Sequence, residues 1–120
     1  MASPDLGQIN IQVHPHRASG LDVERLVASC ETMARGIKAC RGFGSSQGED
    51  EGAYINLTFA TESVASSWPE LRAALLESAE FGAALKRACI CICTGAEGWD
   101  DYLLLHHFDP EQPLNDLTGS

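Results

Sequence analysis

Positive charge is scarce in this sequence and absent from its last part. Eight Lys and Arg residues stand against seventeen Asp and Glu residues, which gives a net charge of −9, and no Lys or Arg follows Arg87. A basic groove for the phosphates of DNA or RNA is hard to build from that balance, so the composition argues against nucleic-acid binding. The same negative field would attract and steer a positively charged protein.

Long apolar runs and the marks of secretion are also missing. Nowhere do about 18 apolar residues follow one another, so we expect no membrane-spanning helix. The start, MASPDLGQINIQV, has neither the basic nor the apolar region of a signal peptide. Five cysteines are an odd number, which does not favour a framework of disulfides. We therefore expect a cytoplasmic protein with reduced thiols.

Local motifs for catalysis are absent. The loop GFGSSQG lacks the lysine and the spacing of a phosphate-binding loop, and no Ser or Cys stands in the context of a nucleophile elbow. We therefore expect no catalytic residue and no cofactor.

Histidines occur as His14-Pro15-His16 and His106-His107. Imidazoles bind zinc, copper and nickel, and two such pairs could form a site with four nitrogens. Neighbouring residues of a strand point to opposite faces, however, so both members of a pair cannot easily reach one ion. We expect no metal site, although a role for these histidines in ligand binding stays open.

Cys89, Cys91 and Cys93 alternate along one apolar segment. Zinc motifs place their thiolates on turns, whereas free cysteines pack like small apolar residues. We interpret the three as core packing, unless their side of the strand faces an open surface.

Hydrophobic periodicity predicts six elements. Alternation predicts strands, and apolar residues at helical spacing predict helices. Gly82 lies within the second predicted helix, 70–87, and glycine disfavours a helix interior. Two short helices would fit this segment equally well. The predicted order is strand, helix, strand, helix, strand, strand, over residues 8–14, 21–39, 54–60, 70–87, 88–93 and 102–108.

These elements predict a single α+β domain over residues 1–120. Two crossover connections followed by a hairpin suggest a mixed four-stranded sheet of order β-α-β-α-β-β along the chain, in a two-layer sandwich with its helices on one face. The glycine-rich segment 41–53 is expected to be a flexible loop, and residues 1–7 and 111–120 to be flexible ends.

One stretch has the composition of an interaction site. Trp and Tyr are frequent at binding hot spots, and flanking carboxylates could pair with Lys or Arg of a partner. Alternatively, Trp99 fills one end of the core. The candidate partner-binding residues are Glu97, Trp99, Asp100, Asp101 and Tyr102, with Glu49, Asp50 and Glu51 as a second cluster.

We therefore expect a small acidic binding protein that inhibits or sequesters a basic protein, in its most concrete form an immunity protein or antitoxin that neutralises a toxin. Two alternatives stay open. One is a small enzyme, or a domain that binds a ligand or metal, using the open face of the sheet. The other is a homodimeric structural module.

Overall fold

The structure is a computed structural model, and it describes residues 7–18, 20–49, 52–95, 98–109 and 111–114. It has an α+β fold, with three α-helices and a five-stranded antiparallel sheet. A 3₁₀ turn, η1 (Pro15–Arg17), follows the first strand. The elements in chain order are β1 (Gly7–Val13), η1, α1 (Val23–Gly36), β2 (Cys40–Glu49), β3 (Ala53–Thr61), α2 (Val64–Leu75), α3 (Gly82–Ala88), β4 (Cys89–Gly95) and β5 (Gly98–His106).

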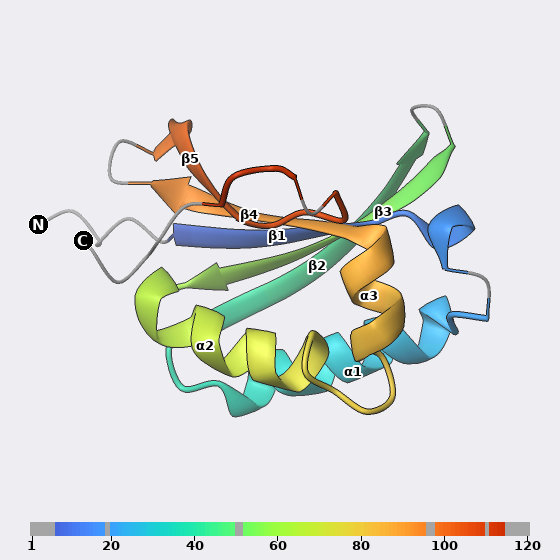
Figure 1. Ribbon diagram of the computed structural model, residues 1–120. Coiled ribbons are helices and arrows are strands. Elements are labelled where there is room, and N and C mark those ends of the chain that lie inside the picture. Colours follow the sequence, from blue (N-terminus) through green and yellow to red (C-terminus); the bar gives the residue numbers. More distant parts are fainter. Residues whose placement is uncertain (1–6, 19, 50–51, 96–97, 110, 115–120) are drawn as a thin grey trace, which may run out of the picture.

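The strand order is β2-β3-β1-β4-β5, and every neighbouring pair is antiparallel. The prediction of a mixed four-stranded sheet is therefore wrong. Both predicted crossovers exist, but each joins two strands that run the same way with a third strand between them. β3 lies between β1 and β2, and β1 lies between β3 and β4 (Figure 1). The first four strands thus have the split β-α-β topology, and β5 is added at one edge.

The predicted flexible loop at 41–53 is mostly strand β2, which pairs with β3 from Cys40 to Glu49. Its sequence CRGFGSSQGE has no alternation of apolar and polar residues. The strand forms because β3 offers it a complete row of backbone partners, so tertiary context decides against local propensity.

Other boundaries shift less. The predicted helix at 21–39 is α1, with Asp22 as its N-cap: the carboxylate accepts a hydrogen bond of 3.1 Å from the amide of Arg25. The predicted 70–87 helix is two helices, α2 and α3, and Ser63 is the N-cap of α2. β5 begins at Gly98, so the residues expected in a loop before Tyr102 belong to a strand.

The core lies between the sheet and the helices, which Figure 1 shows together on one side of it. Alternate residues of β1, β3 and β4 point into this core, and α1, α2 and α3 supply its other side. Cys89, Cys91 and Cys93 are completely buried there, as the packing interpretation predicted. All five cysteines are free and buried.

The opposite face of the sheet carries polar side chains that bond to one another. Asn10 donates to the side-chain oxygen of Asn56 at 3.2 Å and accepts from the hydroxyl of Thr58 at 2.7 Å. Gln12 accepts from His14 Nε2 at 2.8 Å. Gln12 also donates to the side-chain oxygen of Asn56 at 3.5 Å, so the contacts within and between these strands make the face a self-paired polar layer.

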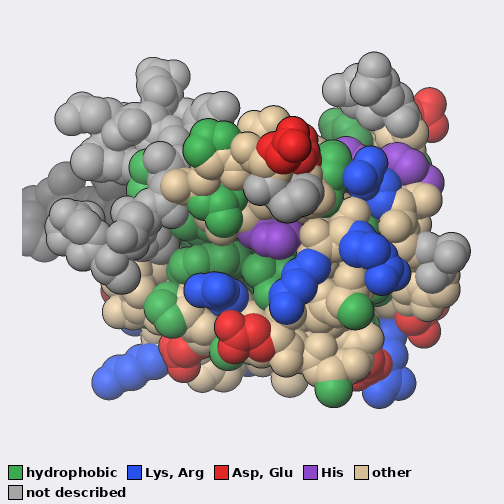
Figure 2. Space-filling model, viewed as in Figure 1, with side chains coloured by type: hydrophobic (Ala, Val, Ile, Leu, Met, Phe, Trp, Pro, Cys, Tyr) green, Lys and Arg blue, Asp and Glu red, His purple; other side chains and the backbone are tan. Residues whose placement is uncertain are grey.

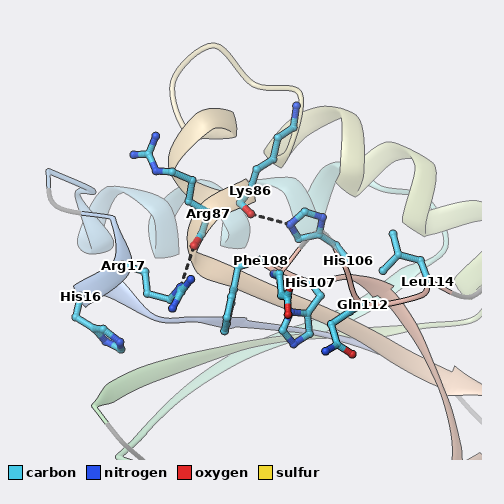
Figure 3. Close-up of a pocket in the computed structure, with 10 residues that line it drawn as sticks. His16, Arg17, Lys86, Arg87, His106, His107, Phe108, Gln112 and Leu114 are labelled. Carbon is cyan, nitrogen blue, oxygen red and sulfur yellow. Dashed lines mark hydrogen bonds between the residues drawn. The ribbon is translucent and has the colours of Figure 1, made fainter.

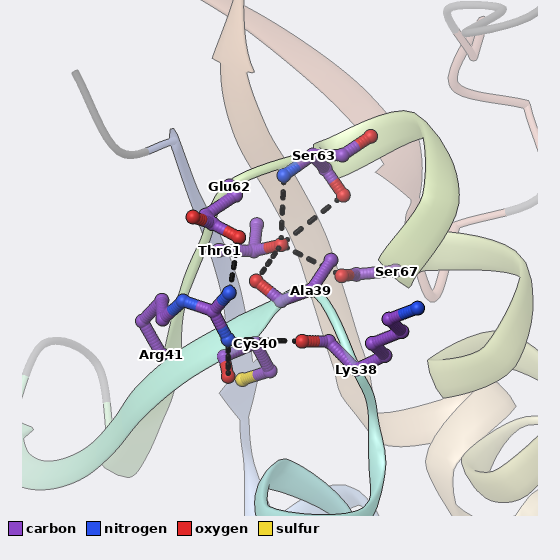
Figure 4. A network of polar contacts seen from close by, with 8 residues as sticks. All are labelled: Lys38, Ala39, Cys40, Arg41, Thr61, Glu62, Ser63 and Ser67. Atoms are coloured by element: carbon purple, nitrogen blue, oxygen red, sulfur yellow. Dashed lines mark hydrogen bonds and ion pairs between the residues drawn. The ribbon is translucent and has the colours of Figure 1, made fainter. Parts of the chain in front are cut away.

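A buried hydroxyl joins the loop before β2 to the start of α2 (Figure 4). Thr61 is completely buried, and its Oγ1 lies 3.1 Å from the carbonyl oxygen of Ala39 and 2.7 Å from Ser67 Oγ. The same oxygen accepts from the amide of Ser63 at 3.1 Å. Outside this network, Arg41 forms an ion pair with Glu62.

Candidate ligand-binding site

The described parts of the two predicted partner-binding clusters are Glu49 and the backbone of β5. Glu49 is exposed at the end of β2, next to the β2–β3 turn, whereas the β4–β5 hairpin lies at the other end of the sheet (Figure 1). Asp50, Glu51 and Glu97 lie outside the described residues. The same applies to the side chains of Trp99, Asp100, Asp101 and Tyr102, whose backbone belongs to β5. Of these candidate residues, the structure thus places the side chain of Glu49 alone, and the partner-binding clusters stay a prediction.

A cavity of about 790 Å³ lies elsewhere, between η1, the C-terminal end of α3 and the chain that follows β5. Such a volume lies within the range of pockets for small organic molecules. Figure 3 shows these residues around the space. They are His16, Arg17, Lys86, Arg87, His106, His107, Phe108, Asp109, Gln112 and Leu114.

Arg17 is held in place from two sides. Its Nε donates a hydrogen bond of 3.1 Å to the carbonyl oxygen of Arg87, and its guanidinium carbon lies 3.8 Å from the centre of the Phe108 ring. The His14 ring meets the same Phe108 edge-on, with 5.6 Å between ring centres. A stacked guanidinium keeps donors free at its edge, which suits it to bind an anion.

His106 closes the opposite side of the cavity. Its Nε2 donates a hydrogen bond of 3.1 Å to the carbonyl oxygen of Lys86. Burial lowers the pKa of this imidazole, and the positive charges of Lys86 and Arg72 lower it further, although the bond to Lys86 acts in the other direction. The hydrogen bonds from Arg17 and His106 are accepted by backbone carbonyl oxygens in the last turn of α3. The last carbonyls of an α-helix have no hydrogen-bond partner within the helix, so these side chains supply one.

The cations of the cavity differ from the other arginines in their ion pairing. The arginines elsewhere each have a carboxylate partner: Arg25 with Glu80, Arg35 with Glu31, Arg41 with Glu62 and Arg72 with Glu77. Arg17, Lys86 and Arg87 have no such partner among the described residues, although the chain has an excess of acids. We define the basic rim as these three residues. Lys38 also has no ion pair among the described residues, but it stands alone, whereas the three cations of the rim line one cavity.

Few carboxylates face this rim. Asp109 is the one acid that lines the cavity within the described residues, and its Oδ1 accepts a hydrogen bond of 3.0 Å from the amide of Glu111. Figure 2 shows Lys and Arg side chains around a hollow with a histidine in it. In Figure 3 the side chains of Lys86 and Arg87 extend from the end of α3 and point away from His107 and Phe108.

The four histidines of the chain do not converge on one point. His14 and His16 stand edge to face with 5.8 Å between ring centres, and His14 donates to Gln12. His106 faces α3, whereas His107 Nδ1 accepts a hydrogen bond of 2.9 Å from the amide of Asp109. No group of three or more His, Cys, Asp and Glu side chains converges in the part of the chain that the structure describes.

Sequence analysis missed the basic rim because its members are far apart in the chain. One local signal was available. Lys86 and Arg87 end a short helix in which positions 82–84, one turn earlier, are Gly, Ala and Ala, so no acid stands at the spacing of a helical ion pair.

Comparison of the chain with protein-family models, with curated proteins and with solved structures gave no match. Among the described residues, no helix has both the length and the apolar character that crossing a membrane requires.

Proposed function

We propose that this protein binds a small anionic organic ligand in the cavity between η1, the end of α3 and residues 106–114. The observation that carries the proposal is the basic rim, where Arg17, Lys86 and Arg87 have no carboxylate partner among the described residues. The chain has a net charge of −9 and repels anions over most of its surface. An anionic ligand can pair with a cation of the rim without breaking an existing ion pair among the described residues.

The rest of the cavity suits the organic part of such a ligand. Phe108 and Leu114 offer apolar surface, and Gln112 offers an amide. The ring nitrogens of His106 and His107 would act as hydrogen-bonding groups toward the ligand. The ligand's anionic group would pair with the rim, while its apolar part would lie against Phe108.

A thermal-shift screen tests this proposal. Citrate, inorganic pyrophosphate and adenosine monophosphate, each at matched ionic strength, serve as probes of anions with different organic parts. A ligand that binds the folded chain raises the melting temperature with concentration. We expect at least one probe to do so, and we expect Lys86→Glu combined with Arg87→Glu to weaken its binding about tenfold or more.

Arg35→Glu combined with Lys38→Glu is the matched control, because both residues are exposed cations away from the cavity and the change in charge is the same. It changes the net charge in the same direction at a distant position. An equal loss of affinity in both variants would mean that the net charge of the protein, and not the cavity, determines binding. If no probe raises the melting temperature, the proposal is contradicted.

A second candidate function follows from the overall charge. An excess of acids over bases, with Glu49 exposed at one end of the sheet, favours a protein that binds and inhibits a basic partner such as a toxin. We propose that the contacts to this partner come from the candidate residues of the sequence analysis, in β5 and near the end of β2. A pull-down from native cells at low salt that yields no basic partner would count against it.

We also propose a cytoplasmic location, since five free thiols fit a reducing compartment better than an oxidising one. Fractionation that recovers the protein outside the cytoplasm would contradict this.

A further inference from the structure

β2 forms one edge of the sheet, and nothing in the described part of the chain pairs with its outer side. Its one neighbour in the strand order is β3. An edge strand leaves a row of backbone N–H and C=O groups available to another strand. The bulge between Cys40 and Gly42 lies at the strand's start, and from Gly42 to Glu49 the register with β3 is continuous.

The usual protections of such an edge are missing from its middle. Proteins block edges with lysine, proline, inward charges or bulges. Between Gly42 and Gly48 the sequence is GFGSSQG, with no charge and no proline, and Ser45, Ser46 and Gln47 are exposed. This stretch therefore carries none of the side chains that usually block the addition of a second strand.

We propose that the partner of this edge is a second copy of the chain, joined through antiparallel pairing of β2 with itself about Ser45. In that register Ser45 faces its own copy. Arg41, which lies at the bulge and pairs with Glu62 of its own chain, faces Glu49 of the other chain, and Glu49 has no ion pair among the described residues. The two ends of the strand thus carry opposite charges at positions that self-pairing brings together. A two-fold axis is the commonest symmetry of soluble homo-oligomers.

An apolar side chain at the same edge supports this arrangement. Phe43 is half-buried and packs on Phe59, with 4.9 Å between ring centres. Beside it, between α1 and β2, lies a notch of about 320 Å³. In the proposed register Gln47 of the second copy lies opposite Phe43, so its aliphatic stem would cover the exposed part of the ring. The net charge of −9 on each chain opposes association, and we therefore expect the dimer to be favoured by moderate salt.

Engineered cysteines distinguish this register from others. Directly opposite Cα atoms of an antiparallel pair are about 4.5–5.5 Å apart, which permits a disulfide between Ser45→Cys and its copy. The same substitution at Gln47 is the matched control, because its two copies would be offset by four residues, or roughly 13 Å along the strand. The native cysteines are buried, so they contribute little background.

Under mild oxidation at moderate salt, we expect Ser45→Cys to give a covalent dimer and Gln47→Cys to stay monomeric. Sedimentation of the unmodified chain should show a dimer at high concentration, and Ser45→Lys, which places two lysines opposite each other, should abolish it without changing the circular dichroism spectrum. A chain that remains monomeric at high concentration, equal cross-linking of the two variants, or cross-linking of Gln47→Cys alone would overturn the proposal.

Discussion

The imidazole of His106 donates a hydrogen bond to the backbone carbonyl of Lys86, at 3.1 Å between Nε2 and oxygen. This contact ties the end of β5 to the end of α3 and forms one wall of the cavity. The ring is half-buried and has a lowered pKa, chiefly because burial disfavours its charged form.

The lowered pKa of His106 predicts a loss of stability in mild acid. The unfolded chain, in which the pKa of histidine is about 6.5, binds the proton more readily than the folded chain does. The free energy of unfolding should therefore fall as the pH drops from about 7.5 through the lowered pKa of the folded state. His106→Gln retains a donor for the carbonyl of Lys86, so it should reduce this dependence. Thermal unfolding at several pH values tests this, and an unchanged pH dependence in the variant would assign the effect to other groups.

Replacing the buried hydroxyl of Thr61 should destabilise the fold. Thr61→Val keeps the shape but leaves the hydroxyl of Ser67 and the amide of Ser63 without their partner (Figure 4). We expect a loss of about 1–3 kcal/mol in the free energy of unfolding, measured with urea. The double variant with Ser67→Ala should lose less than the sum of the two single changes, whereas strict additivity would mean that the hydroxyls act independently.

Two glycines should respond differently to alanine. A Cβ at Gly82 would lie 2.6 Å from the carbonyl oxygen of Leu76, so the backbone around α3 must move, at a cost of about 1–3 kcal/mol. A Cβ at Gly36, at the end of α1, meets nothing within 4 Å. Gly36→Ala should be neutral or stabilising by up to about 1 kcal/mol. Equal effects at both sites would contradict the close approach at Gly82.

If the acidic surface binds a basic partner, reversing two charges of β5 should slow association. Asp100→Lys with Asp101→Lys removes negative charge that would steer the partner, and should also weaken the salt dependence of the association rate. Surface plasmon resonance with the captured partner measures both quantities. Unchanged association kinetics would move the interface to another part of the chain.

Regular alternation and helical spacing were enough to predict β1, α1 and β3, because each buries one face. β2 could not be predicted in this way. Its glycines and serines form a strand only because β3 lies beside it, and the insertion of β3 between β1 and β2 in turn makes the sheet antiparallel.

The candidate site illustrates the same limit. Arg17 and Arg87 are separated by 70 positions, and only the fold brings the first to the carbonyl of the second. The prediction instead favoured the β4–β5 hairpin, because its acidic and aromatic residues are close together in the sequence. The packing of the three alternating cysteines needed only strand periodicity, and it was predicted correctly.

Nuclear magnetic resonance of the labelled chain, titrated with the probe that gives the largest thermal shift, tests the proposed ligand site most directly. We predict that amide signals of Arg17, Arg87 and residues 106–109 move with one common dissociation constant, while those of β2 stay in place. The Lys86→Glu and Arg87→Glu double variant should need a much higher probe concentration for the same change. Shifts concentrated in another part of the molecule, or no saturable shifts at all, would contradict the assignment of this cavity as an anion-binding site.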